Sequence, residues 1–267
     1  MSGAALTQPA PSPRVQGSST PESTGSLTLP LVLAGPLQAW GSSSRFSRRN
    51  TENAPTKSGV VGLLAAALGR DRTADLADLA ALRFGVRVDQ PGTRVRDYQT
   101  AHHLVTGVSM PVSERFYLSD AVFVVAVEGG SELVRRLYEA VLAPVYLPYL
   151  GRRSCPPSRP LELGEPAASP LEDVLRDLPW QAAGWYRKRR GLRQGPDIEL
   201  STYVDAMPGG SRADSLRDLP LSFDPRHRRY GLRAIRSGSV TVPNSELVER
   251  RVQAAPDHDP LSALGDP

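Results

Sequence analysis

The chain has 267 residues, 40% of them hydrophobic, and this is enough to form the core of one large domain or two small ones. Its 32 Lys and Arg residues against 28 Asp and Glu give a net charge of +4, an excess that permits a polyanionic partner without indicating one. The single cysteine, Cys155, excludes an internal disulfide and a cysteine-based zinc cluster. Because no apolar run is long enough for a signal peptide or a membrane span, we expect a cytoplasmic protein with no membrane contact, metal or cofactor.

The two ends of the chain differ in composition from its middle. Residues 1–26 are rich in Ser, Pro, Gly and Thr, and they predict a disordered extension; residues 243–267 predict a similar tail. The ordered part begins where Leu29, Leu31 and Leu33 alternate with other residues, as in a β-strand.

Helix and strand patterns then follow one another. Thr56 or Ser58 can cap a helix that stops at Gly69. Further along the chain, the patterns predict a short helix, a half-buried strand, a buried strand and a second helix capped by Ser131: residues 76–82, 84–88, 121–127 and 131–142. This order is that of an α+β, RRM-like ferredoxin-like fold, βαββαβ, with an insertion before the buried strand. We predict this domain over residues 27–165.

The region that follows, residues 166–242, predicts a small β-rich C-terminal part. Its strand candidates are residues 198–204 and 230–235, which stand among Gly, Pro and Arg. A strongly basic run, Arg187–Arg193, precedes them. Such a run is typical of a solvated surface, and contact with RNA or target DNA is the alternative.

Four stretches carry a family resemblance. They read AGPLQAWG, PTKSGVVGLLA, RDYQT and PYLGRRSCP, and they occupy residues 34–41, 55–65, 96–100 and 148–156. In this order and spacing they resemble the CasD family, a subunit of the type I-E CRISPR surveillance complex Cascade that belongs to the RAMP superfamily. The similarity covers residues 28–165 well and the rest weakly.

The resemblance implies a role in antiviral defence as an RNA-binding subunit without catalytic activity. A subunit of this family holds the 5′ handle of the CRISPR RNA, caps the backbone filament and bridges to the large subunit, CasA, with target DNA nearby. It also implies a β-hairpin thumb, here residues 94–114, that packs on the backbone subunit CasC. Three features depart from the family pattern: the N-terminal extension, Gln99 where a histidine is common, and the arginine-rich run.

The first stretch supplies three candidate RNA contacts. Glycines such as Gly41 let a nucleic-acid backbone approach main-chain N–H groups closely. Gln38 can bond a base edge, and Trp40 can stack on a base. The alternative for this stretch is a turn after a strand, with Trp40 in the core.

Basic residues supply the next candidates. Lys57 and Ser58 begin a predicted helix, whose free N–H groups and dipole suit a phosphate, although an ordinary capped helix fits as well. Arg45 lies in a basic loop with Arg48 and Arg49, which can follow an RNA backbone or be solvated. The family signature also places Arg152 and Arg153 beside the handle; either can instead pair with a carboxylate that fixes the turn.

The thumb supplies the last candidates. The resemblance makes Arg115 a candidate for holding a kinked RNA at the end of the handle, where Tyr98 either stacks or packs within the hairpin. The alternative function is a metal-independent endoribonuclease that processes CRISPR repeat RNA. Such cleavage needs a general acid and a general base, for which His102, Lys57 and Tyr98 are the only obvious candidates.

Overall fold

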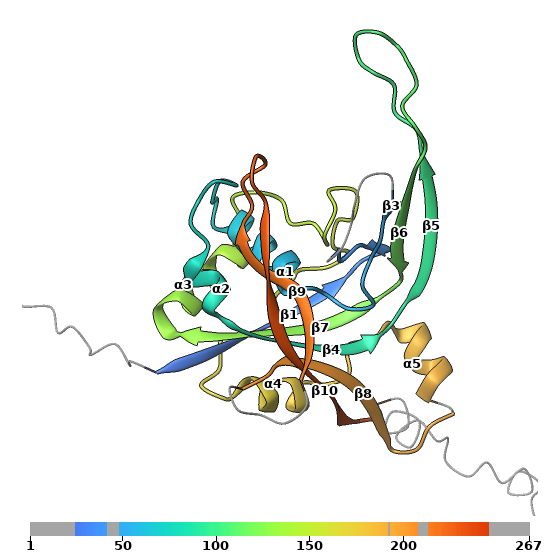
Figure 1. The fold of residues 1–267 in the computed structure, drawn as a ribbon. Coiled ribbons are helices and arrows are strands. Elements are labelled where there is room, and N and C mark those ends of the chain that lie inside the picture. The colour runs from blue at the N-terminus through green and yellow to red at the C-terminus, as the bar shows by residue number, and fades with distance from the viewer. Residues whose placement is uncertain (1–24, 42–47, 192, 208–212, 246–267) are drawn as a thin grey trace, which may run out of the picture.

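The computed structural model describes residues 25–41, 48–191, 193–207 and 213–245 (Figure 1). The predicted N-terminal extension and C-terminal tail lie almost entirely outside these residues, as does Arg45. Among the described helices, none has the length and apolar character needed to cross a bilayer.

A six-stranded antiparallel sheet forms the centre of the molecule, with strand order β1-β7-β4-β8-β10-β9. Strand β7, which lies between β1 and β4, is buried on both faces, which explains its continuous apolar sequence. Phe123 and Val125 face one hydrophobic cluster, and Val124 and Ala126 face another. The six strands are β1 (Ser26–Ala34), β4 (Arg83–Gln90), β7 (Val122–Gly130), β8 (Asp197–Asp205), β9 (Asp214–Ser222) and β10 (Arg229–Pro243).

Helices cover both faces of this sheet. The larger cluster packs under α1 (Lys57–Ala67), α2 (Ala77–Ala81) and α3 (Ser131–Leu142), and the smaller one under α4 (Leu171–Asp177). A fifth helix, α5 (Gly184–Gly191), lies beyond the sheet (Figure 1). The predicted cap of α1 is confirmed, because the Thr56 hydroxyl accepts a hydrogen bond from the Gly59 N–H at 3.3 Å. The predicted Ser131 cap is wrong: Gly130 occupies the cap position and Ser131 is the first helical residue.

The ferredoxin-like prediction is met in part. Strands β1, β7 and β4 and helices α1 and α3 follow the expected order, but the closing fourth strand is not formed. Residues 161–167 make only two isolated bridges to β1, from Glu162 and Ala167. Pro160 directly precedes this segment and Pro166 lies within it, and a proline has no N–H to donate to a strand ladder. The fold is therefore mixed α/β with mainly antiparallel sheets, and β8, β10 and β9 continue the main sheet beyond β4.

The predicted thumb is a long β-hairpin that projects from this body (Figure 1). Its strands are β5 (Thr93–Gln99) and β6 (Ser113–Ser119), so the returning strand continues past the predicted end. On its other edge, β6 pairs with two short strands near the body, β2 (Leu37–Gln38) and β3 (Arg48–Arg49). The hairpin is thus attached to the body along β6.

A buried ionic network ties α1 to the last three strands. The Arg233 guanidinium lies between Asp218, at 2.7 and 2.8 Å, and Asp205, at 2.7 Å. The Lys57 ammonium also contacts Asp205, at 3.0 Å. In addition, the Lys57 backbone N–H donates to Asp218 at 2.8 Å, so this carboxylate caps the helix. Buried charges need partners of opposite charge. Here Asp205 and Asp218 pair with Arg233 and Lys57, and Asp218 also caps the N-terminus of α1.

We expect Asp218→Ala to destabilise the fold by about 3–5 kcal/mol, because it leaves the Arg233 guanidinium half-paired in the interior. The measurement is the free energy of unfolding in urea. Asp177→Ala is the control, since it removes a carboxylate of an exposed pair with Arg176 and should change stability little. Equal effects of the two substitutions would contradict the structural role of the network.

Candidate nucleic-acid interface

The turn of the fourth stretch is locked against the first. Gly151 has φ +85°, and a Cβ at this position would overlap the carbonyl oxygen of Ala39. The Ala39 N–H donates to the Leu150 carbonyl at 3.1 Å, and the Leu150 N–H donates to the Cys155 carbonyl at 2.7 Å. The two stretches, more than 100 residues apart, therefore form one compact unit.

Arg152 leaves this turn towards the base of the hairpin. Its Nη2 donates to the Arg49 carbonyl at 2.9 Å, and its guanidinium lies 4.6 Å from the centre of the Tyr117 ring. A guanidinium over an aromatic face is held by the ring quadrupole and keeps its charge. Its Nη1 is buried and has no hydrogen-bond partner within the described residues. Arg152 is thus positioned by one backbone group and one ring, with donor capacity remaining.

Two more arginines meet at the same place. Arg49 of β3 and Arg115 of β6 are register partners in a parallel ladder, which puts their side chains on one face. Tyr117 lies two residues after Arg115 and shares this face. Asp97 of β5, the register partner of Arg115 on the other edge, adds one carboxylate to it. We call Arg49, Arg115, Tyr117 and Arg152 the thumb-base cluster.

Arg115 is the half-buried member of the thumb-base cluster. Its Nε is shielded from solvent and has no hydrogen-bond partner in the described part of the chain. A buried donor without a partner costs free energy, and an incoming acceptor such as a phosphate oxygen would remove that cost. The cluster therefore favours an anionic ligand at the base of the hairpin.

Gln38 and Trp40 do not reach this surface, which corrects the expectation that they contact bases. Both are fully buried. The Gln38 amide donates to the carbonyls of Leu33 and Ala121, at 3.1 and 2.8 Å, and accepts the Trp40 indole N–H at 3.0 Å. The ring of Trp40 packs against Gly59, where a Cβ would lie 2.8 Å from it. A buried indole needs an acceptor, and Gln38 supplies it.

Lys57 and Ser58 are also interior residues, with 5% and 7% of their surface exposed. The carboxylate of Asp218 occupies the helix N-terminus where a phosphate was expected, and Asp205 pairs with the Lys57 ammonium. Ser58 lies 3.5 Å from the Thr56 hydroxyl. The expected phosphate contact is therefore replaced by carboxylates of the chain itself.

Three further candidates within the described residues are accessible. Gly41 and Arg153 are exposed, and Arg153 follows Arg152 directly in the turn. Tyr98 is 54% exposed on β5, with the guanidinium of Arg96 4.8 Å from its ring centre. Of the predicted residues, the structure thus brings Arg115 and Arg152 to the same place. It adds Tyr117, which was not predicted as a site residue; the only signal for it in the sequence is that it is an aromatic residue close after Arg115.

Comparison with known proteins agrees with the four sequence stretches. Residues 28–236 match the model of the family described as CRISPR-associated protein (Cas_Cas5). The chain belongs to this family. The Cas5 chain is also 41% identical, over 165 residues, to a protein named CRISPR system Cascade subunit CasD of Escherichia coli strain K12; the match covers 54% of this chain and 74% of that protein. The resemblance inferred from the sequence is therefore confirmed.

Solved structures support the same assignment of the Cas5 chain. A structure described as a crystal structure of a Cas protein shares 38% identity and a TM-score of 0.62, over 82% of this chain and 96% of that one. A chain from a structure described as a CRISPR RNA-guided surveillance complex shares 32% identity and a TM-score of 0.67, over 82% and 92% of the two chains. The fold and the family therefore agree.

Two of the acid–base candidates of the alternative function, Lys57 and His102, do not meet in this Cas5 chain. Lys57 is enclosed in its ion pair, whereas His102 is exposed in the connection at the far end of the hairpin. Cys155 is fully buried, and burial raises the pKa of its thiol, which leaves the weakly nucleophilic protonated form. Lys57 and His102 are thus not placed to act as an acid–base pair, and Cys155 is not placed to act as a nucleophile.

We expect Gly151→Ala to destabilise the Cas5 chain by about 1–3 kcal/mol or more, because the new Cβ meets the Ala39 carbonyl and the backbone conformation is left-handed. Gly107→Ala is the matched control: Gly107 also has a positive φ, +67°, but a Cβ there meets no atom within 4 Å. The measurement is the midpoint of urea unfolding. Similar shifts for the two variants would show that the contact with Ala39 is unimportant.

Proposed function

We propose that this Cas5 chain is the CasD-type subunit of a cytoplasmic Cascade complex, and that it binds the 5′ handle of the CRISPR RNA without being an enzyme. The observation that carries the proposal is the thumb-base cluster, in which three arginines and a tyrosine meet below a projecting hairpin. The name of the Escherichia coli relative and the description of the surveillance-complex structure support it.

The chemistry of the thumb-base cluster suits a bent single strand. The guanidinium of Arg115 offers a planar fork for two phosphate oxygens. Arg152 adds a cation that its contact with Tyr117 keeps in place. Sequence-specific RNA recognition targets splayed, unpaired nucleotides, whose phosphates converge at a kink. The exposed ring of Tyr98 lies on the opposite face of the hairpin, because its register partner is Glu114, and it is available for a base of a strand that passes around the edge of β5.

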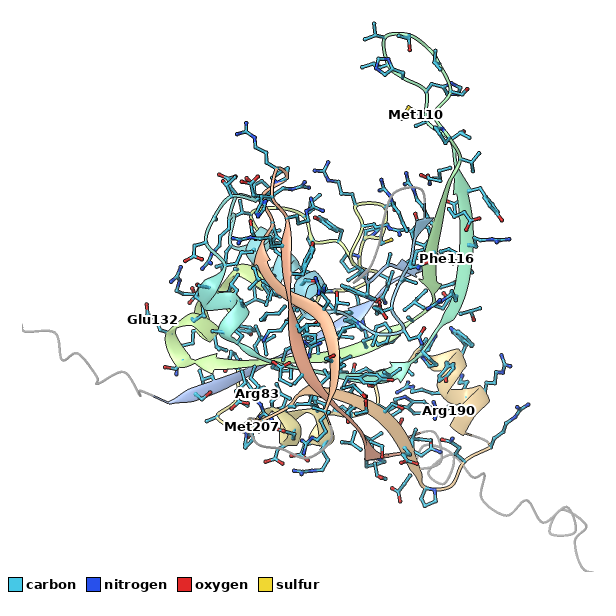
Figure 2. All side chains as sticks on the ribbon, viewed as in Figure 1. Arg83, Met110, Phe116, Glu132, Arg190 and Met207 are labelled. Atoms are coloured by element: carbon cyan, nitrogen blue, oxygen red, sulfur yellow. The ribbon has the colours of Figure 1, made fainter. Side chains whose placement is uncertain are left out.

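The far end of the hairpin suits a protein partner. Large apolar side chains there are more than half exposed, and Figure 2 shows Met110 well away from the body: Leu104, Val105, Val108, Met110 and Val112. Such a group of apolar side chains marks an interaction site. We assign it to the neighbouring backbone subunit, CasC, so that this chain caps the filament and bridges to the large subunit, CasA.

We expect Arg115→Lys to weaken guide-RNA retention almost as much as Arg115→Ala, by about 1–3 kcal/mol, because lysine keeps the charge but loses the fork. The measurement is the guide-RNA content of Cascade rebuilt with each variant. Arg135→Ala is the control, since Arg135 is exposed on α3, away from the hairpin.

Two outcomes would contradict this interpretation of Arg115. Wild-type retention by Arg115→Lys would mean that Arg115 acts only as a point charge. Early melting of both variants with unchanged RNA content would show that Arg115 has a structural role.

We expect Arg152→Ala to lower the slope of log affinity against log salt by about one for all handle sequences, because one phosphate contact is lost. An unchanged slope would remove Arg152 from the interface.

For the partner, we expect the double substitution Leu104→Asp and Val105→Asp to abolish copurification with CasC, because charges cannot be buried in an apolar contact. The melting temperature of the isolated chain should stay unchanged, since both side chains are exposed. Leu221→Asp, at a 53% exposed position of β9, is the control. Copurification at the wild-type level would show that the hairpin end is not the docking surface.

A further inference from the structure

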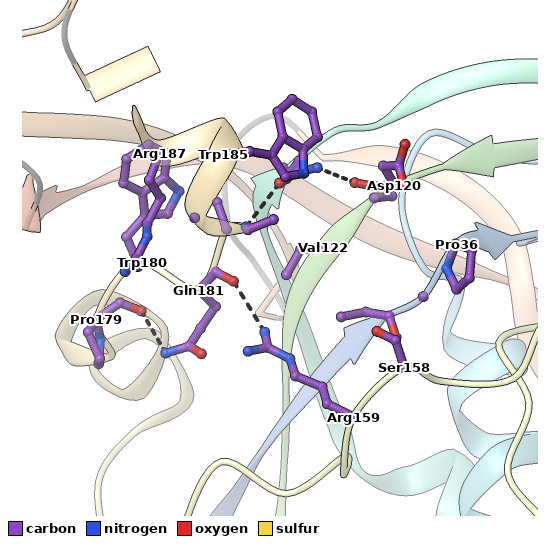
Figure 3. Close-up of a pocket in the computed structure, with 17 residues that line it drawn as sticks. Pro36, Asp120, Val122, Ser158, Arg159, Pro179, Trp180, Gln181, Trp185 and Arg187 are labelled. Carbon is purple, nitrogen blue, oxygen red and sulfur yellow. Dashed lines mark hydrogen bonds between the residues drawn. The ribbon is translucent and has the colours of Figure 1, made fainter. Parts of the chain in front are cut away.

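A pocket of about 620 Å³ lies between the ends of β1 and β7 and the segment that leads into α5 (Figure 3). It is separate from the thumb-base cluster, none of whose residues lines it. Arg159, Arg187 and Trp185 line it together with residues 34–36 and 120–122. Its size is in the range of small-molecule and cofactor sites.

The wall of the pocket is rigidly attached to β4. The indole of Trp180 donates to the Asp89 carbonyl at 2.9 Å, and the Gln181 N–H donates to the Asp89 carboxylate at 2.6 Å. The Ala183 N–H donates to the Gln90 side chain at 3.1 Å, and the Gln90 amide in turn donates to the Asp120 carbonyl. Because these bonds fix backbone on both sides, the pocket is preformed.

Arg159 is the half-buried cation of the pocket. Its Nη2 donates to the Gln181 carbonyl at 3.2 Å (Figure 3), and its Nε is buried without a hydrogen-bond partner within the described residues. It makes no direct ion pair in that part of the chain; the Asp89 carboxylate attracts it only from a longer distance, and burial lowers the pKa of its guanidinium. A half-buried cation with an unpartnered donor is unfavourable, and a phosphate would supply both charge and an acceptor.

Helix α5 presents an aromatic ring at the rim. Tyr186 and Arg190 hold the helix to the body: Tyr186 contacts Trp180 edge-on at 6.2 Å, and Arg190 donates to the Glu199 carbonyl at 3.3 Å. Trp185 forms a T-shaped pair with Tyr186, at 5.7 Å between ring centres and an interplanar angle of 89°, and remains 55% exposed. Because of this exposure, its indole is accessible to a planar group.

We propose that this pocket binds one nucleotide of a single-stranded nucleic acid, with its base on Trp185 and its phosphate at Arg159 and Arg187. Asp120 also lines the pocket, and its carboxylate directs a phosphate towards the two arginines. Exposed Lys188 and Arg189 on the same helix extend the positive surface. The site rests on the proposed function, since it adds a second contact for a strand in a nucleic-acid-binding chain.

Two single-stranded nucleic acids offer such a base and phosphate: the guide RNA and a strand of the target DNA. The test uses the full chain with a fluorescein-labelled oligouridylate and, separately, an oligothymidylate of the same length. Trp185→Ala should raise the Kd of the preferred strand about tenfold, as for one lost base stack, and Trp185→Phe should keep the affinity. Arg159→Gln should lower the salt slope by about one, whereas the control Arg135→Ala should affect neither.

Crosslinking gives an independent readout. Irradiation of a 5-iodouridine strand should join it to Trp185, and the preference for ribose or deoxyribose identifies the source. If Arg115→Ala weakens binding while the Trp185 and Arg159 variants do not, and crosslinks map only near Tyr117, the pocket proposal is overturned and the proposed function stands. If the pocket variants weaken binding and Arg115→Ala does not, the pocket is supported and the handle assignment fails.

Discussion

The ion pair between Arg87 and Asp89 is the interaction on which the C-terminal half of the molecule depends. Both side chains are completely buried in β4, and Arg87 binds Asp89 through two nitrogens at 2.8 and 2.9 Å. The remaining N–H groups of the Arg87 guanidinium donate to backbone carbonyls at the end of α4 and just after it, so no donor is left for water. These carbonyls belong to Leu175, Leu178 and Pro179. A desolvated pair is stable only when every donor is satisfied, and this requirement places α4 and the pocket wall on the sheet.

The network of Lys57, Asp205, Asp218 and Arg233 uses the same principle at the other side of the sheet. Together the two networks enclose several of the basic residues. The modest positive charge of the chain therefore says little about its surface, since what matters is which cations keep an unused hydrogen-bond donor. In the described residues, Arg115, Arg152 and Arg159 are among the arginines with a buried nitrogen that has no hydrogen-bond partner.

Local patterns predicted the elements well and the site less well. The cap at Thr56 and the two-sided burial of β7 follow from neighbouring residues. Lys57, by contrast, is paired by carboxylates 148 and 161 positions away, so its surroundings cannot be read from its own stretch. Strand β9 was not predicted, because Pro220 and interspersed charges obscure its alternation. The four family stretches located the right region, but three of them also supply buried residues of the hydrophobic core.

The hairpin has a thermodynamic consequence for assembly. Beyond the body it is a two-stranded ribbon, and β5 pairs only with β6 among the described strands. Isolated ribbons of this kind are marginally stable, so the first partner to bind must overcome their loss of conformational entropy. Arg115 lies on the strand that continues to the apolar end, and a second ligand meets a ribbon already ordered. If RNA and a protein partner bind as proposed, occupancy at one end of the hairpin would raise affinity at the other, reciprocally and by the same factor.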